Sequence, residues 1–86
     1  QIRYGTSTLV RGDGDPDSDD AWQIQQPYVR ALQEDLTSIG FDTNGTDGIY
    51  GKDTYATVVQ FQERNQLGVD GKAGPATKSL LYDLSH

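Results

Sequence analysis

The chain has 86 residues, enough for one domain and too few for two. It contains no cysteine, which excludes disulfides, thiolate metal sites and a cysteine nucleophile. Its net charge is −6 without a basic stripe, which argues against binding to nucleic acid or to an anionic membrane surface. No apolar run approaches the roughly 20 residues of a membrane span, so we expect no membrane insertion.

The chain begins at Gln1 and shows no secretory signal pattern. We interpret it as a fragment or processed form of a larger protein, whose other parts would carry an export signal and any catalytic activity.

The N-terminal region, residues 1–27, is predicted to be an irregular extension. Its first part is expected to cover the core as an extended lead-in through Ile2, Tyr4, Leu9 and Val10. Residues 12–20 (GDGDPDSDD) are acidic and rich in turn formers, which predicts an exposed loop. In residues 21–27, Trp22 and Ile24 are candidate packing residues.

The first predicted helix runs from Pro27 to Ile39. Its apolar side chains recur at helical spacing on one face, at Val29, Leu32, Leu36 and Ile39. Pro27 suits the first turn, where its missing N–H is not needed. Gly40 is expected to end the helix, with Phe41 folding back onto the last turn.

Two more helices are predicted after the turn-rich residues 42–51. One spans Lys52–Asn65, with Thr54, Val58 and Phe61 on one face. The other spans Pro75–Leu84, with Pro75 at its first position, and carries Thr77, Leu80, Leu81 and Leu84. The pattern predicts an all-α fold, a three-helix bundle with an irregular N-terminal extension, in which residues 28–86 form the helical domain.

One eight-residue pattern, Asp-Gly-x-x-Gly-x-x-Thr, occurs twice. The copies consist of Asp47, Gly48, Gly51 and Thr54, and of Asp70, Gly71, Gly74 and Thr77. Each opens an apolar helix, which indicates a genuine repeat, with Val58 matching Leu81 and Phe61 matching Leu84. The Asp should bond turn N–H groups, the first Gly should take a positive φ, and the second should allow close chain approach. The Thr hydroxyl should satisfy a free backbone group. The motif therefore has a structural explanation of its own.

The order and spacing of these elements resemble the peptidoglycan-binding domain type 1 family. The resemblance covers about residues 28–82 and rests on Val29-x-x-Leu32-Gln33-x-x-Leu36-x-x-x-Gly40, Asp47-Gly48-x-Tyr50-Gly51-x-x-Thr54, Val58-x-x-Phe61-Gln62 and Leu67-x-Val69-Asp70-Gly71-x-x-Gly74-x-x-Thr77-x-x-Leu80. It implies a three-helix module appended to cell-wall hydrolases and other envelope-directed proteins. Thr57 stands where the family usually has Ala, and the acidic stretch 12–20 is not typical of its lead-in.

The resemblance implies non-catalytic binding of peptidoglycan, through its glycan strand or its stem peptide. The implied location is extracytoplasmic: the periplasm, the cell wall, or secretion as part of a larger protein. Helix N-termini attract carboxylates, and two such ends follow Gly51 and Gly74. We therefore predict a shallow groove beside both motifs with Tyr50, Lys52, Tyr55 and Lys72 as ligand contacts. The alternative is that Tyr50 is core and both lysines are solvated. No cofactor is expected, and the isolated domain should be a monomer.

Other residue patterns give weaker evidence for a function. The acidic run Asp13-x-Asp15-x-Asp17-x-Asp19 resembles the opening of a calcium loop but lacks its Gly and its final Glu, so we predict no metal site. Arg11-Gly12-Asp13 spells an integrin-type tripeptide that occurs often by chance. The terminal His86 is the sole histidine, and Trp22 is either packing or a ligand platform. The helical carboxylates are expected to face solvent, which argues against an acid–base pair: Glu34, Asp35, Asp53 and Glu63.

The alternative function is a protein-interaction or regulatory domain. Related helical modules serve as pro-segments of extracellular metalloproteases, where a cysteine typically blocks the zinc. The absence of cysteine counts against that role here. A degenerate copy that keeps the fold without the ligand is a third possibility.

Overall fold

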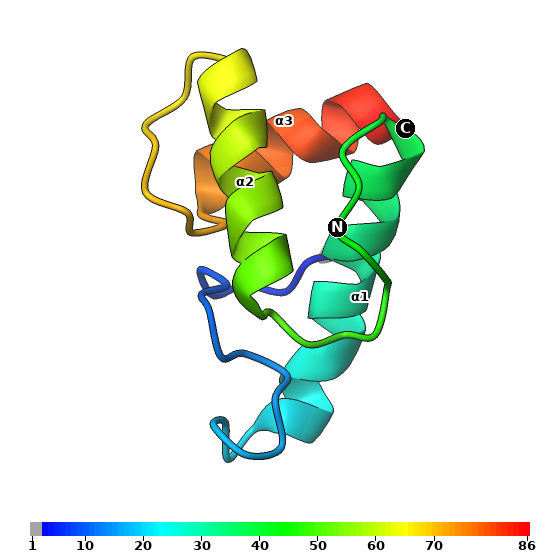
Figure 1. The fold of residues 1–86 in the computed structure, drawn as a ribbon, viewed down its shortest axis with the longest axis vertical. Helices are drawn as coiled ribbons and strands as arrows, with labels where there is room; N and C mark the ends of the chain where they lie inside the picture. The colour runs from blue at the N-terminus through cyan, green and yellow to red at the C-terminus, as the bar shows by residue number, and fades with distance from the viewer. Residues whose placement is uncertain (1–2) are drawn as a thin grey trace.

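The computed structural model describes residues 3–86 and contains three helices, α1 (Trp22–Ser38), α2 (Lys52–Arg64) and α3 (Pro75–Ser85). In Figure 1, α1 and α2 run along the long dimension of the molecule, and α3 crosses near the end where the C-terminus lies. The described residues contain no strand, only an antiparallel bridge between Leu9 and Ala73. The predicted all-α class is confirmed. Among the described residues, none of the helices combines the length and the hydropathy that a membrane span requires.

The core draws on all three helices and on the segments that precede them. Phe41 packs edge-on against Phe61, with ring centroids 5.5 Å apart. Tyr4 and Leu9 of the lead-in are buried as predicted, whereas Ile2 lies outside the described residues. The buried apolar side chains are Tyr4, Leu9, Val29, Ala31, Leu32, Leu36, Tyr50, Val58, Phe61, Ala73 and Leu81.

Helix α1 begins at Trp22, five residues before the predicted start at Pro27. The prediction was wrong because a turn at Asp19 leads directly into the helix: its carbonyl accepts from the N–H of Trp22 and its carboxylate from that of Ala21. Pro27 therefore lies inside the helix, where it removes one backbone bond to the carbonyl of Gln23. That loss falls near the exposed first turn, so the helix tolerates it. The predicted domain boundary after residue 27 falls within this helix.

The C-terminal end of α1 follows the prediction. Gly40 has φ +98°, and the N–H of Phe41 reaches back to the carbonyl of Leu36. The backbone reversal places Phe41 against the core, as expected of a helix that ends at glycine.

Two predicted packing residues are exposed instead. Ile24 is 66% exposed because it lies on the first turn of α1, ahead of the core-facing part of the helix. Leu84 is 51% exposed, whereas Phe61, its counterpart in the repeat, is fully buried. Near the end of α3 it is Tyr82 that packs on the core, and its ring stacks on His86 with centroids 4.5 Å apart.

A buried carboxylate joins both ends of the described chain to α1. Asp35, predicted to face solvent, is only 5% exposed. Its oxygens accept from the Arg3 guanidinium at 2.6 and 2.9 Å and from the Tyr4 hydroxyl, and Nε2 of His86 lies 3.3 Å away. Burial tends to raise the pKa of Asp35, but the hydrogen bonds from Arg3, Tyr4 and His86 outweigh it and hold the pKa below its usual value.

This network predicts a pH-dependent contribution to stability. Because the folded-state pKa of Asp35 is lowered, its contribution is present above the unfolded pKa of about 3.9 and is lost as the pH falls through the folded value. We expect Asp35→Asn to lower the free energy of unfolding at pH 7. The difference in this free energy between variant and wild type should become smaller as the pH falls towards 3. Urea denaturation at both pH values measures this. Asp20→Asn, at an exposed loop position, is the control, and a gap that does not change with pH would contradict the account.

Candidate functional site

The first copy of the repeat forms a loop, residues 47–54, that is anchored by one buried glutamine of α1. Oε1 of Gln33 accepts from the N–H of Gly48 at 2.8 Å. Its Nε2 lies within hydrogen-bond distance of Asp47 Oδ1, the Ile49 carbonyl and the Thr54 hydroxyl. A single side chain therefore contacts four residues of the loop.

The second copy, residues 70–77, is anchored in the same way by Gln62 of α2. Oε1 of Gln62 accepts from the N–H groups of Asp70 and Gly71 at 3.1 and 3.0 Å. Its Nε2 reaches Asp70 Oδ1, the Lys72 carbonyl and the Thr77 hydroxyl at 3.0, 2.8 and 3.1 Å. Each loop is thus fixed to the preceding helix, and we call the two together the signature loops.

Several predictions for the repeat are confirmed. The aspartates accept from the N–H two residues on, at Ile49 and Lys72, and the first glycines have φ values of +81° and +72°. In the second loop, the backbone bond from Lys72 and the bond from Gln62 hold the pKa of Asp70 below its usual value.

Two details of the repeat were predicted wrongly. Neither second glycine is a point of close approach: a Cβ at Gly51 would meet nothing within 4 Å, and the nearest atom at Gly74 is 3.8 Å away. Each instead precedes its helix in an extended conformation. The threonine hydroxyls accept from the side-chain amides of the anchoring glutamines rather than satisfying a free backbone group.

The lead-in segment, residues 9–13, connects the two signature loops. Leu9 exchanges two backbone hydrogen bonds with Ala73, at 3.1 and 2.8 Å. Tyr50, which occupies the equivalent place in the first loop, receives a bond from Gly12 and donates one to Asp13. Backbone hydrogen bonds to this segment, which lies outside the repeat, therefore join the two loops.

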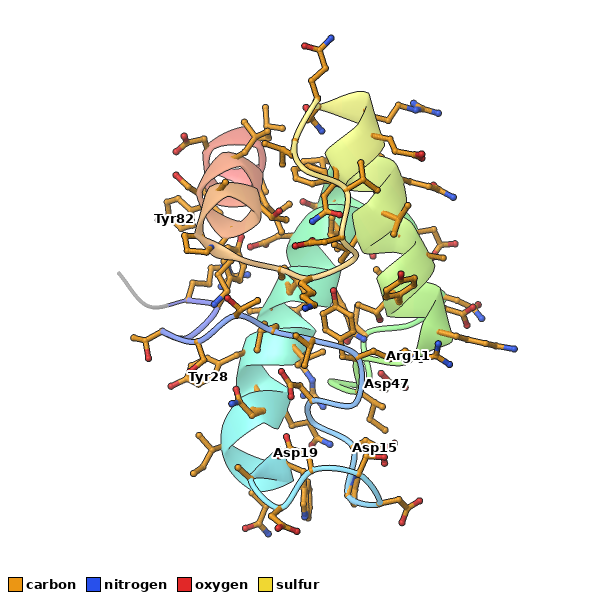
Figure 2. The ribbon with its side chains drawn as sticks, turned by 90° about the vertical axis from the view of Figure 1, so that its left-hand side faces the viewer. Arg11, Asp15, Asp19, Tyr28, Asp47 and Tyr82 are labelled. Atoms are coloured by element: carbon orange, nitrogen blue, oxygen red, sulfur yellow. The ribbon has the colours of Figure 1, made fainter. Side chains whose placement is uncertain are left out.

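The acidic loop, residues 12–20, is folded against the first signature loop. A Cβ at Gly14 would lie 2.0 Å from the carbonyl oxygen of Gly48, so the two backbones touch there. Carboxylates of Asp15 and Asp19 accept from backbone N–H groups of the loop itself, and that of Asp13 accepts from the N–H of Val10 in the lead-in segment. Figure 2 shows Asp15 and Asp19 beside the start of α1. Among the described residues, no three His, Cys, Asp or Glu side chains form a group that could hold a metal ion.

The structure separates the four predicted ligand contacts. Tyr50 is fully buried and its hydroxyl donates to the Gly71 carbonyl at 2.6 Å, so its ring is core and has no surface for a ligand. Burial, with the nearby charges of Asp70 and Asp13, raises the pKa of Tyr50. Lys52, Tyr55 and Lys72 are exposed. We therefore remove Tyr50 from the predicted contacts and keep the other three.

Tyr55 lies where the two signature loops meet. A Cβ at Gly71 would lie 2.2 Å from the Tyr55 ring, so the ring rests directly on the second loop while its backbone belongs to α2. The ring remains 39% exposed. Lys52 is one helical turn before Tyr55, and Lys72 directly follows Gly71, so both cations flank this contact.

Each signature loop also borders a small cleft. The cleft at the first loop, of about 220 Å³, is lined by Gln33, Asp47 and Lys52 among others. The cleft at the second, of about 250 Å³, is lined by the equivalent Gln62 and Asp70 and by Lys72. A wider one of about 580 Å³ separates Lys52 from Arg11 and the acidic loop. The lysines thus border different clefts around the meeting point of the loops.

The two glutamines that anchor the signature loops were not among the predicted site residues. Gln33 and Gln62 follow apolar core residues, in Leu32-Gln33 and Phe61-Gln62, and each precedes a copy of the repeat. The sequence signal that could have identified them is that a glutamine precedes each Asp-Gly pair. Each glutamine is only 1% exposed, and its side-chain amide is used to hold a signature loop.

A model of the family described as "Putative peptidoglycan binding domain" matches residues 25–81. The chain belongs to this family. The resemblance drawn from the repeat is thereby confirmed, and the match begins inside α1, close to the predicted start of the helical domain.

Similar proteins include cell-wall hydrolases. A spore cortex-lytic enzyme of Bacillus cereus is 46% identical over 53 residues, which are 62% of this chain and 20% of that enzyme. The N-acetylmuramoyl-L-alanine amidase CwlM of Mycobacterium tuberculosis is 35% identical over 83 residues, 96% of this chain and 19% of the amidase. The chain therefore spans about a fifth of the length of these curated relatives.

A crystal structure of the SleB N-terminal domain is similar over nearly the whole chain. The TM-score is 0.75 and the identity 32%, and the alignment covers 93% of this chain and 94% of that chain. The similarity thus includes most of the lead-in and acidic loop along with the helices.

Proposed function

We propose that this chain binds peptidoglycan without catalysing a reaction and holds a larger cell-wall hydrolase or envelope-directed effector at its substrate. The family and the hydrolases that contain similar segments support the ligand. The proposed location is extracytoplasmic, where peptidoglycan is accessible.

The contact of Tyr55 with Gly71 is the observation that best supports this surface as the ligand-binding surface. It places an exposed aromatic ring over the junction of two loops that buried glutamines hold rigid. Rigid loops lose little conformational entropy when a ligand binds, which favours affinity. Lys52 and Lys72 add positive charge to an acidic chain where a stem-peptide carboxylate would approach.

Retention on purified sacculi tests this proposal. We expect the wild-type chain to sediment with sacculi, and the triple variant Lys52→Ala, Tyr55→Ala, Lys72→Ala to bind about tenfold more weakly or worse, as the loss of an aromatic contact and two charges implies. The two cation-to-alanine changes are matched by the control Arg30→Ala with Arg64→Ala, exposed helical positions that should leave retention unchanged. Equal retention of the triple variant would show that another surface binds.

A further inference from the structure

A further cleft lies on the α3 side of the molecule, away from the acidic loop. It is bounded by residues 3–5 of the lead-in and by Lys78, Ser79, Tyr82 and Asp83 of α3, and its volume is about 290 Å³. Figure 2 shows Tyr82 towards the opposite end of the long axis from Asp15 and Asp19. We call it the α3 cleft. Small-molecule sites range upward from about 300 Å³, so its size suits one ring.

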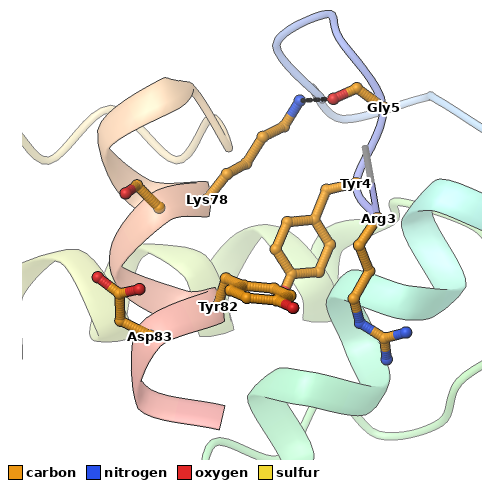
Figure 3. Close-up of a pocket in the computed structure, with 7 residues that line it drawn as sticks. Arg3, Tyr4, Gly5, Lys78, Tyr82 and Asp83 are labelled. Atoms are coloured by element: carbon orange, nitrogen blue, oxygen red, sulfur yellow. Dashed lines mark hydrogen bonds between the residues drawn. The ribbon is translucent and has the colours of Figure 1, made fainter. Parts of the chain in front are cut away.

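The walls of the α3 cleft are held in place by hydrogen bonds. Tyr82 stacks on His86, which contacts Asp35, and Asp35 in turn holds Arg3 and Tyr4. On the other side, the Lys78 ammonium donates to the carbonyls of Gly5 and Ser7. Figure 3 shows Lys78 reaching across the cleft to Gly5, with the Tyr82 ring beneath it. A ligand would enter a preformed site.

The chemistry of the α3 cleft is that of an aromatic ring surrounded by hydrogen-bonding groups. Tyr82 lines the cleft with a partly buried ring that stacks on His86. Two of the three N–H donors of Lys78 go to carbonyls, which leaves one for a ligand, while Ser79 and Asp83 are exposed and supply a hydroxyl and a carboxylate. A pyranose presents C–H groups on its faces and hydroxyls around its edge, which matches this arrangement.

The charges favour a neutral ligand over an anionic one. Asp35 already pairs with Arg3, so that guanidinium is not a free cation. Asp83 faces the same cleft as Lys78 and would repel a carboxylate. A stem peptide with free carboxylates therefore fits less well than an uncharged sugar.

We propose that the α3 cleft binds one N-acetylated amino-sugar ring of the glycan strand, with Tyr82 as its platform. This inference rests on the proposed function, because it names the part of peptidoglycan that a second surface of the chain contacts. The ring lies over Tyr82, and Lys78, Ser79 and Asp83 bond its edge.

Titration with a soluble N-acetylglucosamine trimer, followed by amide NMR, tests the α3 cleft directly. We expect the largest shifts at Gly5 and at residues 78–83, and about tenfold weaker binding in Tyr82→Ala. Because Tyr82 packs on the core, Ser79→Trp provides a second test: it fills the cleft from an exposed position and should abolish the shifts. Gln60→Trp places the same side chain on the exposed face of α2 and should leave them intact.

The outcomes separate this inference from the proposed function. A folded Ser79→Trp variant that binds the trimer like wild type overturns the α3 cleft site, as does a wild-type chain that shows no shifts there. Shifts at residues 78–83 from a sugar-free stem peptide, with none from the trimer, also overturn it. Failure of the wild type to sediment with sacculi instead overturns the proposed function, and the trimer then decides the cleft alone.

Discussion

Replacement of Gln62 with leucine is expected to lower the free energy of unfolding by about 3 kcal/mol, because buried donors and acceptors left without partners cost about 1–3 kcal/mol each. Gln62 bonds two N–H groups, a carbonyl, a carboxylate and a hydroxyl of the second signature loop. Leucine has a similar volume but can replace none of these bonds. The N–H of Gly71, a buried residue, would lose its partner.

Thermal denaturation measures the effect of Gln62→Leu. For a domain of this size, a loss of about 3 kcal/mol lowers Tm by roughly 12–24 °C. The control is Gln60→Leu, on the exposed face of the same helix, which should change stability by less than about 0.5 kcal/mol. If the two variants had the same Tm, Gln62 would not be the residue that fixes the second signature loop.

Gly14→Ala is expected to be the most disruptive change in the acidic loop. Gly14 has φ +79°, and an added Cβ would lie 2.0 Å from the backbone oxygen of Gly48. Neither atom can move without shifting a backbone, so the clash adds to the conformational cost. We expect a loss of about 3 kcal/mol or more, from overpacking together with left-handed backbone strain.

Gly40→Ala separates these two costs. Gly40 has φ +98° but nothing within 4 Å of an added Cβ, so only the strain of about 1–2 kcal/mol should appear. Urea denaturation of both variants gives the difference. A Gly14→Ala variant no less stable than Gly40→Ala would contradict the packing of the acidic loop on the first signature loop.

The fold was predictable where the determinants are local. Lys52 and Pro75 begin their helices as predicted, and Gly40 ends α1, because each signal acts within one helical turn. The start of α1 was missed because Pro27 is a strong local signal, whereas the carbonyl and carboxylate of Asp19 act through a loop whose composition indicated only exposure.

The interior of the site was predictable only in part. Hydropathy treats a glutamine as solvent-facing, so the burial of Gln33 and Gln62 is visible only once each loop is placed beside its helix. Asp35 is paired with Arg3, a residue 32 positions away in an irregular segment that no periodicity describes. The interactions that fix the site are therefore mostly long-range.

Sedimentation of the wild-type chain with purified peptidoglycan sacculi tests the central claim most directly. We predict saturable retention that soluble peptidoglycan fragments reverse by competition, with circular dichroism confirming the helical fold of the bound preparation. A folded chain that stays in the supernatant over the whole range of sacculus concentrations would contradict the claim that this domain binds peptidoglycan.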